Sequence, residues 1–279
     1  MWTWLNFIAN PLGKFLNFLY ENVAFRNYGL AIIIFTIIMR LLILPLTLKQ
    51  YRSSAKMQEL GPQIQELQKK YKNDKAKLNE EMMKFYSENK VNPAGGCLPL
   101  LIQMPILFAL YQVIRFPLTY MKGWDATKIA QHFAELTKGE KIAGYKEISI
   151  VIKEKVLDMH FLGLNIGMVP KLSKQFLIDD PNRIEYWALL ILPILATATT
   201  FLSSKLMMSS NMSQQSGMNN QMAGMQKTMM YFAPLMTLFI SFQVPSGLIL
   251  YWTTGYIIQI FQQIYINKTI FKKKEVVSK

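Results

Sequence analysis

Long apolar segments alternate with polar connections along the chain. An α-helix rises about 1.5 Å per residue, so roughly 20 apolar residues cross the ~30 Å hydrocarbon layer of a bilayer. The pattern therefore predicts an all-α fold, a polytopic membrane protein with five transmembrane helices. The predicted spans are residues 28–48, 98–117, 187–203, 229–244 and 247–266.

The composition supports the membrane assignment. Hydrophobic residues make up 51% of the 279 residues and charged residues only 17%, unlike a soluble domain of this length. The single cysteine, Cys97, cannot form a disulfide within one chain, and both histidines, His132 and His160, fall in a polar connection. No cluster of Cys or His has the spacing of metal ligands. We therefore expect no cofactor and no metal, and an intramembrane protease that uses serine and histidine is disfavoured.

Lysine and arginine are concentrated in some of the polar connections. The segments 49–97, 204–228 and 267–279 are all basic, and the positive-inside rule places them in the cytoplasm. The basic tail, 267–279, has two interpretations: it anchors the topology beside anionic lipid, or it contacts a polyanion such as ribosomal RNA. The C-terminus is predicted to be cytoplasmic.

The remaining polar segments are then outside the membrane. Residues 1–27 mix aromatic and aliphatic side chains with asparagine and lysine, which predicts an external, interfacial amphipathic helix and an outer N-terminus. Residues 118–186 form a long external loop, whose length prevents its charge from setting the topology.

The cytoplasmic segment 49–97 has apolar residues at helical spacing. Met57, Leu60 and Ile64 begin a stripe that resumes after Asn73-Asp74, which predicts a helical hairpin. The two stripes either pack on each other or offer contacts to a partner or client protein.

The cytoplasmic segment 204–228 is rich in methionine. Its flexible thioether side chains could form an adaptable contact for apolar client segments, or they could be the lipid-facing start of the fourth span. The candidate contact residues are Met218, Met222 and Met225.

Arg40 lies near the middle of the first predicted span. An arginine at that depth costs about 2.5–3.5 kcal/mol on insertion scales and normally faces water, protein or a counter-charge. It could snorkel to the headgroups, bind an anion, or line a hydrated cavity; Thr36, one turn earlier on the same helix face, favours the cavity. The polar residues expected to line it from other spans are Gln103, Thr197, Thr200 and Gln259.

Three motifs in order resemble a known family. Residues 27–32 with 35–46, residues 92–106 and residues 242–252 are similar to the YidC/Oxa/Alb membrane protein insertases, in the short, Gram-positive-type bacterial form. The resemblance covers all five predicted spans and the cytoplasmic hairpin. It implies a five-helix core in the bacterial cell membrane.

The resemblance also implies a function and a site. The family's groove arginine falls on Arg40, and Thr36 and Trp252 match groove positions. The implied insertase is not an enzyme. It has a hydrophilic, positively charged groove that is open to cytoplasm and lipid and closed toward the outside. Through it, polar tails of nascent membrane proteins pass while apolar segments enter the bilayer.

The implied partners are nascent membrane proteins and lipid, with the ribosome, the signal recognition particle pathway and the Sec translocase as further candidates. Nucleic acid would be met only as ribosomal RNA. The alternative is a small-anion transporter or channel with Arg40 as its binding site. Such a transporter predicts inverted internal repeats, and the sequence shows none between its two halves.

Overall fold

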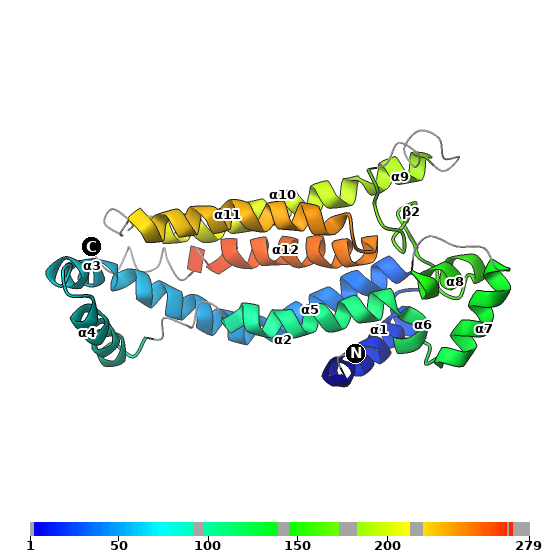
Figure 1. Ribbon diagram of the computed structural model, residues 1–279, viewed down its shortest axis with the longest axis horizontal. Coiled ribbons are helices and arrows are strands. Elements are labelled where there is room, and N and C mark those ends of the chain that lie inside the picture. The colour runs from blue at the N-terminus through cyan, green and yellow to red at the C-terminus, as the bar shows by residue number, and fades with distance from the viewer. Residues whose placement is uncertain are drawn as a thin grey trace. The chain divides into compact units, whose positions relative to one another are not determined.

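The computed structural model describes residues 3–91, 98–138, 145–172, 183–212, 220–266 and 268–269. These residues are almost all helical and fold as two compact units (Figure 1). Unit 1 comprises Met1–Arg40, Gln103–Thr200 and Pro234–Ile258, and unit 2 comprises Leu41–Ile102, Phe201–Ala233 and Gln259–Lys279.

The helices of the predicted spans do not coincide with the apolar segments that predicted them: the second ends at Arg115 instead of residue 117, and the third is interrupted at Leu190. The elements that contain these segments are α2 (Tyr28–Glu59), α5 (Leu98–Arg115), α9 (Arg183–Leu189), α10 (Ile191–Met212), α11 (Asn220–Ser241) and α12 (Ser246–Ile266). The first span was predicted to end at Leu48, but α2 continues to Glu59. Charge alone does not end a helix. The chain continues as helix until it reaches Gly61 and Pro62.

Two of the described helices are long and apolar enough to cross a membrane, Tyr28–Met57 and Ile184–Met207, and Met230–Ser241 is a shorter apolar helix. Only 28% and 39% of the most apolar windows of the two long helices are buried inside the structure. The core helix of a soluble protein would be mostly buried. These helices suit a membrane protein, while the number of five spans stays a prediction.

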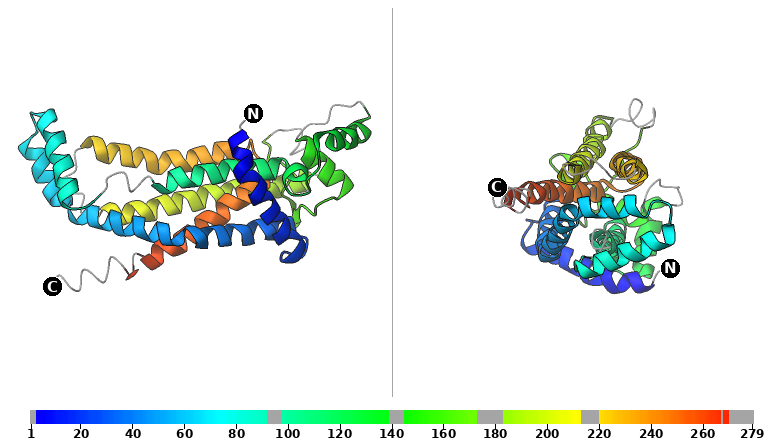
Figure 2. Two further views of the ribbon diagram at one scale, coloured as in Figure 1. Left: turned by 90° about the horizontal axis from the view of Figure 1, so that it is seen from below. Right: turned by 90° about the vertical axis from the view of Figure 1, so that its left-hand side faces the viewer.

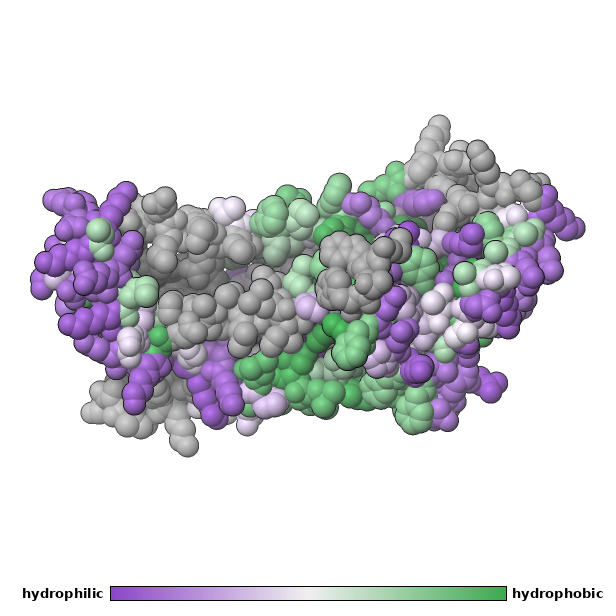
Figure 3. Space-filling model, turned by 60° about the horizontal axis from the view of Figure 1, so that its bottom comes forward, coloured by the Kyte–Doolittle hydropathy of each residue, from purple (hydrophilic) through white to green (hydrophobic). Residues whose placement is uncertain are grey.

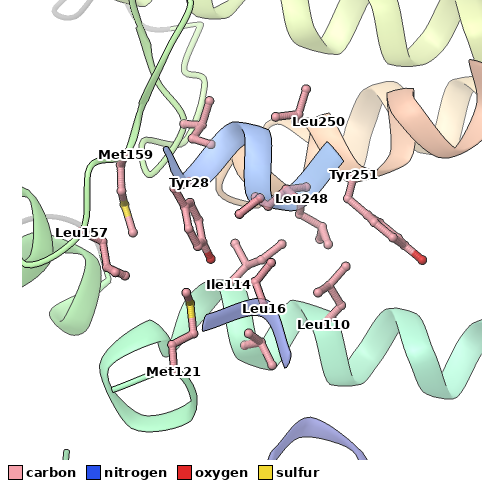
Figure 4. Close-up of a cluster of buried hydrophobic side chains, with 14 of the residues drawn as sticks. Leu16, Tyr28, Leu110, Ile114, Met121, Leu157, Met159, Leu248, Leu250 and Tyr251 are labelled. Atoms are coloured by element: carbon pink, nitrogen blue, oxygen red, sulfur yellow. The ribbon is translucent and has the colours of Figure 1, made fainter. Parts of the chain in front are cut away.

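Unit 1 has an apolar core shared by several helices. Leu16 of α1 (Thr3–Asn22), Tyr28 of α2, Leu110 and Ile114 of α5 and Leu248 of α12 point toward one another (Figure 4). Each of these side chains is at most 2% exposed. Figure 2 shows α1, the blue N-terminal helix, running across the direction of α2 rather than alongside it.

The predicted loop 118–186 contains regular structure. It includes most of α6 (Pro117–Tyr120), then α7 (Ala126–Thr137), α8 (Lys146–Glu154) and an antiparallel hairpin of β1 (His160–Phe161) and β2 (Leu164–Asn165). The short hairpin is an addition to the predicted all-α fold. At the right of Figure 3, where α7 and α8 of unit 1 lie, many of the side chains are hydrophilic.

Unit 2 contains two short helices where the helical hairpin was predicted. They are α3 (Gly61–Lys70) and α4 (Lys75–Glu88), and they contact each other. Asp74 caps α4, because its Oδ1 accepts a hydrogen bond of 3.0 Å from the Lys77 amide. Met57 lies near the end of α2 rather than in the hairpin. Neither α3 nor α4 has a fully buried residue.

Candidate functional site

Arg40 lies against a glycine of α12. A Cβ atom built on Gly255 would be 2.9 Å from Nη2 of Arg40 and 3.4 Å from its Nε, so the guanidinium occupies the space that any other side chain would need. Gly255 is buried and Arg40 is half-buried. The missing side chain at residue 255 therefore allows the cation of α2 to approach the backbone of α12.

A tyrosine one turn earlier on α12 also interacts with Arg40. Tyr251 is 5% exposed and interacts electrostatically with Arg40. Its hydroxyl accepts a hydrogen bond of 2.8 Å from Nε2 of Gln103 on α5. Arg40, Gln103 and Tyr251 thus form one polar cluster among three helices of unit 1. Arg40 and Gln103 were among the predicted groove residues, whereas Tyr251 was not, although it stands beside Trp252 in the third motif.

The threonines of the predicted groove donate hydrogen bonds within their own helices. Thr36 and Thr200 are each 1% exposed, and their hydroxyls donate to the carbonyl oxygens of Ile32 at 2.6 Å and Ala196 at 2.7 Å. Thr197 donates to Pro193 in the same way at 2.7 Å. Because each hydroxyl proton is already donated to a backbone carbonyl, only the lone pairs of the hydroxyl oxygen remain. Such a hydroxyl can accept a hydrogen bond but cannot donate one to a carboxylate.

The other predicted groove residues lie in both units. Trp252 is half-buried and packs against the core of unit 1. Gln259 is half-buried and belongs to unit 2.

The predicted contact residues of unit 2 differ in exposure. Leu60 is 8% exposed, and Met57 and Ile64 are half-buried. Met218 lies outside the described residues. The backbone of Met222 and Met225 is described within α11, but their side chains are not.

The segment 158–168 caps the N-terminal end of α2. The Tyr28 amide donates to the Asp158 carbonyl at 3.0 Å, and Nδ2 of Asn27 donates to the His160 carbonyl at 2.8 Å. The ring of Phe161 packs over Gly29, where an added Cβ would lie 2.4 Å from its Cγ. A buried helix end needs such partners, because its first amides have none within the helix.

The same segment caps the N-terminal end of α12. The Ser246 amide and hydroxyl donate to the Met168 carbonyl at 2.8 and 2.7 Å, and the Gly247 amide donates to the Ile166 carbonyl at 2.7 Å. Ser246 is completely buried, and so is Ile249 in the next turn. Dry packing and satisfied amides therefore close this end of unit 1.

The long helices of unit 1 expose large apolar side chains elsewhere. Ile194 of α10 and Leu235 and Phe239 of α11 are each 64% exposed, and Ile37 of α2 is 42% exposed. Such surfaces are costly in water and suit lipid. Among the described residues, no group of three or more His, Cys, Asp or Glu side chains could hold a metal ion.

Comparisons with known proteins agree with the motifs. Residues 18–274 match the family described as 60Kd inner membrane protein. The chain is 37% identical over 265 residues to the membrane protein insertase YidC of Treponema denticola, which covers 94% of this chain and 38% of that protein. It is 36% identical over 266 residues to the membrane protein insertase YidC of Fusobacterium nucleatum, covering 95% of this chain and 98% of that protein.

A third relative is the membrane protein insertase YidC of Oceanobacillus iheyensis, 37% identical over 254 residues, with 89% of this chain and 78% of that protein covered. These matches support a place in the bacterial inner membrane. The resemblance to the YidC/Oxa/Alb insertases is confirmed, and the chain belongs to the 60Kd inner membrane protein family.

Proposed function

We propose that this protein is a membrane protein insertase that uses the cluster around Arg40 to draw polar tails of nascent membrane proteins into the membrane. The observation that carries the proposal is the fixed position of the Arg40 guanidinium, against Gly255 and beside Tyr251 in a predicted span. The names of relatives that align with most of this chain support the same activity.

The physical advantage of such a groove lies in the cost of desolvation. A charged or polar tail that enters hydrocarbon loses its water without replacement, which costs several kcal/mol or more per group. A fixed cation part-way through the membrane offsets part of that loss for a carboxylate, because attraction between charges strengthens as the local dielectric constant falls. The apolar part of the client can leave sideways into lipid. No energy-consuming reaction is needed.

The residues divide this work. Arg40 attracts carboxylates of the translocating tail. Gln103 and Tyr251, which are joined by a hydrogen bond, provide polar groups near the guanidinium. Thr197, which is half-buried, accepts hydrogen bonds from backbone amides or water through its remaining lone pairs, whereas Thr36 and Thr200 are buried and belong to the packed wall. Trp252 meets the apolar segment of the client. In unit 2, Gln259 and the candidate contact methionines offer polar and apolar contacts of their own.

The proposal includes an orientation. The capped ends of α2 and α12 face the outside, so the groove is open to the cytoplasm and lipid only. By the positive-inside rule, the basic segment with α3 and α4 and with Met57, Leu60 and Ile64 is cytoplasmic, where it contacts clients or partner proteins. Assistance in membrane protein folding, alone or with the Sec translocase, and contacts with the ribosome or the signal recognition particle pathway belong to the same proposal.

Site-specific photo-crosslinking in proteoliposomes tests the groove. A crosslinker at the half-buried Trp252 should capture the acidic tail of a stalled client, and one at the exposed Phe239 should not. Arg40→Ala should reduce insertion of a client with an acidic tail by about tenfold or more, and Arg40→Lys should restore part of it, because lysine keeps the charge but not the planar guanidinium.

A matched control is Arg52→Ala, which removes an exposed arginine from the same helix. We expect it to insert the client normally. Equal crosslinking from Phe239 and from Trp252 would contradict the groove. Saturable uptake of small anions by the purified protein, without insertion of the client, would instead support the transporter alternative.

A further inference from the structure

A second polar site lies in unit 1, away from Arg40. Five helices and their connections surround a pocket of about 510 Å³, and Asn6 of α1, Phe116 just after α5, Tyr120 of α6 and Glu147 of α8 are among its lining residues. This volume falls within the roughly 300–1,000 Å³ of small-molecule pockets. The groove mechanism uses none of these residues.

The pocket combines charges of both signs with apolar walls. Asp125 and Glu147 bring two carboxylates and Lys146 brings one ammonium, while Phe116 and Ile129 are among the apolar lining residues. The ammonium of Lys146 lies 4.9 Å from the ring centre of Phe133. The lining therefore has one more negative charge than positive, which favours a ligand that carries a cation.

Glu147 is an unusual carboxylate for a pocket wall because it is only 5% exposed. The Thr119 amide donates to its Oε2 at 3.0 Å, and the Thr119 hydroxyl donates to its Oε1 at 2.6 Å. Burial nevertheless raises the pKa of Glu147, with the hydrogen bonds from Thr119 opposing that shift. A cation in the pocket would offset the lost hydration of this carboxylate.

Asp125 holds its carboxylate at the start of α7. Its Oδ1 accepts a hydrogen bond of 2.7 Å from the Lys128 amide, which fixes the side chain as the cap of the helix. Its second oxygen remains able to accept from a ligand. Two carboxylates, one from the residue that caps α7 and one on α8, are thus positioned by the fold itself.

The position of the pocket in unit 1 indicates which molecules can reach it. Phe116 lines the pocket and directly follows the last residue of α5. The first residue of α5 follows the predicted cytoplasmic segment 49–97, so Phe116 lies at the other, outer end of the helix. α1 forms another wall, and it exposes Phe7 by 86% and Phe18 by 54%, as an interfacial helix does. In the orientation of the proposed function, the pocket opens at the level of the outer lipid headgroups.

We infer that this pocket binds the zwitterionic headgroup of an outer-leaflet phospholipid that carries a primary ammonium, the ethanolamine class. The ammonium donates to Asp125 and Glu147, the phosphodiester lies toward Lys146, and the apolar walls accept the beginning of the acyl chains. The inference rests on the membrane orientation of the proposed function, but it concerns lipid binding and does not involve the groove at Arg40.

Native mass spectrometry of the purified full chain tests the inference. The protein is exchanged from detergent into defined mixtures of phosphatidylethanolamine, phosphatidylglycerol and phosphatidylcholine, and bound lipids are counted. We expect one phosphatidylethanolamine to be retained preferentially. Phosphatidylglycerol lacks the cation, and the trimethylammonium of phosphatidylcholine has no N–H to donate.

Two variants and one control identify the site. Asp125→Asn keeps a good helix cap but loses the charge, and Glu147→Gln removes the buried charge. Each should weaken phosphatidylethanolamine binding by about tenfold, the usual value of one hydrogen bond to a charged group. Glu135→Gln removes an exposed carboxylate of α7 outside the pocket and should change nothing.

Circular dichroism of each variant shows whether the fold is kept. If Glu147→Gln unfolds, the lipid selectivity of Asp125→Asn alone still tests the site. Equal retention of the three lipids, or unchanged selectivity in Asp125→Asn, would overturn the inference, because the bound lipid would then be annular lipid without a specific site. Insertion of a client by the same samples is measured separately. Lost lipid selectivity with normal insertion rejects this site alone, and failed insertion with normal lipid selectivity rejects the proposed function alone.

Discussion

The two pairs of short helices, α7 with α8 and α3 with α4, look alike in length and differ in burial. In both pairs the helices contact each other. α8 buries Glu147, Ile148, Ile150 and Val151, whereas α3 and α4 bury no residue completely. One pair is built into the apolar core of its unit, and the other is held mainly by its own shared contacts.

The difference teaches which parts can move. Regions with few buried apolar contacts open locally at a small free-energy cost, whereas regions within a core open only with the whole unit. The pair α3 and α4 therefore suits reversible contacts with partners. The segment from α8 to Met168, which caps α2 and α12, suits a permanent closure.

Truncating the same residue type in each pair should show the largest contrast. Ile150 is completely buried, so Ile150→Ala should cost about 2–5 kcal/mol through lost packing and a cavity. Ile64 on α3 is half-buried, and Ile64→Ala should cost less than about 1 kcal/mol. Hydrogen–deuterium exchange measures the stability of each region separately. Similar losses at the two positions would show that α3 and α4 are as firmly packed as α8.

Adding a methyl group in each region tests the same contrast from the opposite direction. Gly29→Ala places a Cβ 2.4–2.5 Å from Phe161, so it should destabilise unit 1 by about 1–3 kcal/mol. Gly61 at the start of α3 has no atom within 4 Å of such a Cβ, and Gly61→Ala should be neutral or stabilise by up to about 1 kcal/mol. Denaturant titrations in detergent provide both values. A tolerated Gly29→Ala would mean that the β1–β2 hairpin does not hold α2 tightly.

The sequence predicts those helices whose local pattern of apolar and capping residues agrees with the packing around them in the folded chain. Asn73-Asp74 indicated a break between two apolar stripes, and the structure has Asp74 as the cap of α4. The sequence did not predict α8, because Ile148, Ile150 and Ile152 alternate with other residues in a pattern typical of a strand. Burial of one helix face in the core overrides that local preference.

The polar cluster around Arg40 could be predicted only in part. A charge within an apolar segment is visible in the sequence, and Gln103 is a polar residue in another such segment. The hydrogen bond between Gln103 and Tyr251 joins residues 148 positions apart, and only the folded chain determines that pairing. The role of Gly255 likewise depends on where the Arg40 side chain lies, because a glycine alone does not reveal what approaches it.

Removing a hydroxyl group from the packed region should have a smaller effect than either change in packing. The hydroxyl of Tyr28 is buried and has no hydrogen-bond partner among the described residues, so Tyr28→Phe should leave stability unchanged or raise it by up to about 1 kcal/mol. Tyr20 is the matched control, since its hydroxyl accepts from the Asp158 amide at 2.9 Å and Tyr20→Phe leaves that amide unpaired. Thermal unfolding in detergent should show a loss only for Tyr20→Phe. A loss for Tyr28→Phe would reveal a partner, such as ordered water, for its hydroxyl.

The smallest expected effect is the pH dependence that Glu147 gives to the packed pair α7 and α8. Burial raises the pKa of Glu147 above its usual value of 4.5, so the folded chain binds the proton more tightly than the unfolded chain does. The stability from this group is fully present below that usual pKa and is lost as the pH rises through the higher folded pKa. Unfolding of the wild type and of Glu147→Gln, followed from pH 4 to 8 in detergent free of phosphatidylethanolamine, isolates the effect.

The wild type should lose stability relative to Glu147→Gln as the pH rises, with no corresponding change in the exchange rates of α3 and α4. Adding phosphatidylethanolamine should then flatten the wild-type profile, because a bound ammonium stabilises the charged carboxylate. A difference that grows in the opposite direction would mean that the hydrogen bonds from Thr119 outweigh burial at Glu147. The carboxylate would then be stable without a ligand, and the closed end of unit 1 would need no lipid to complete it.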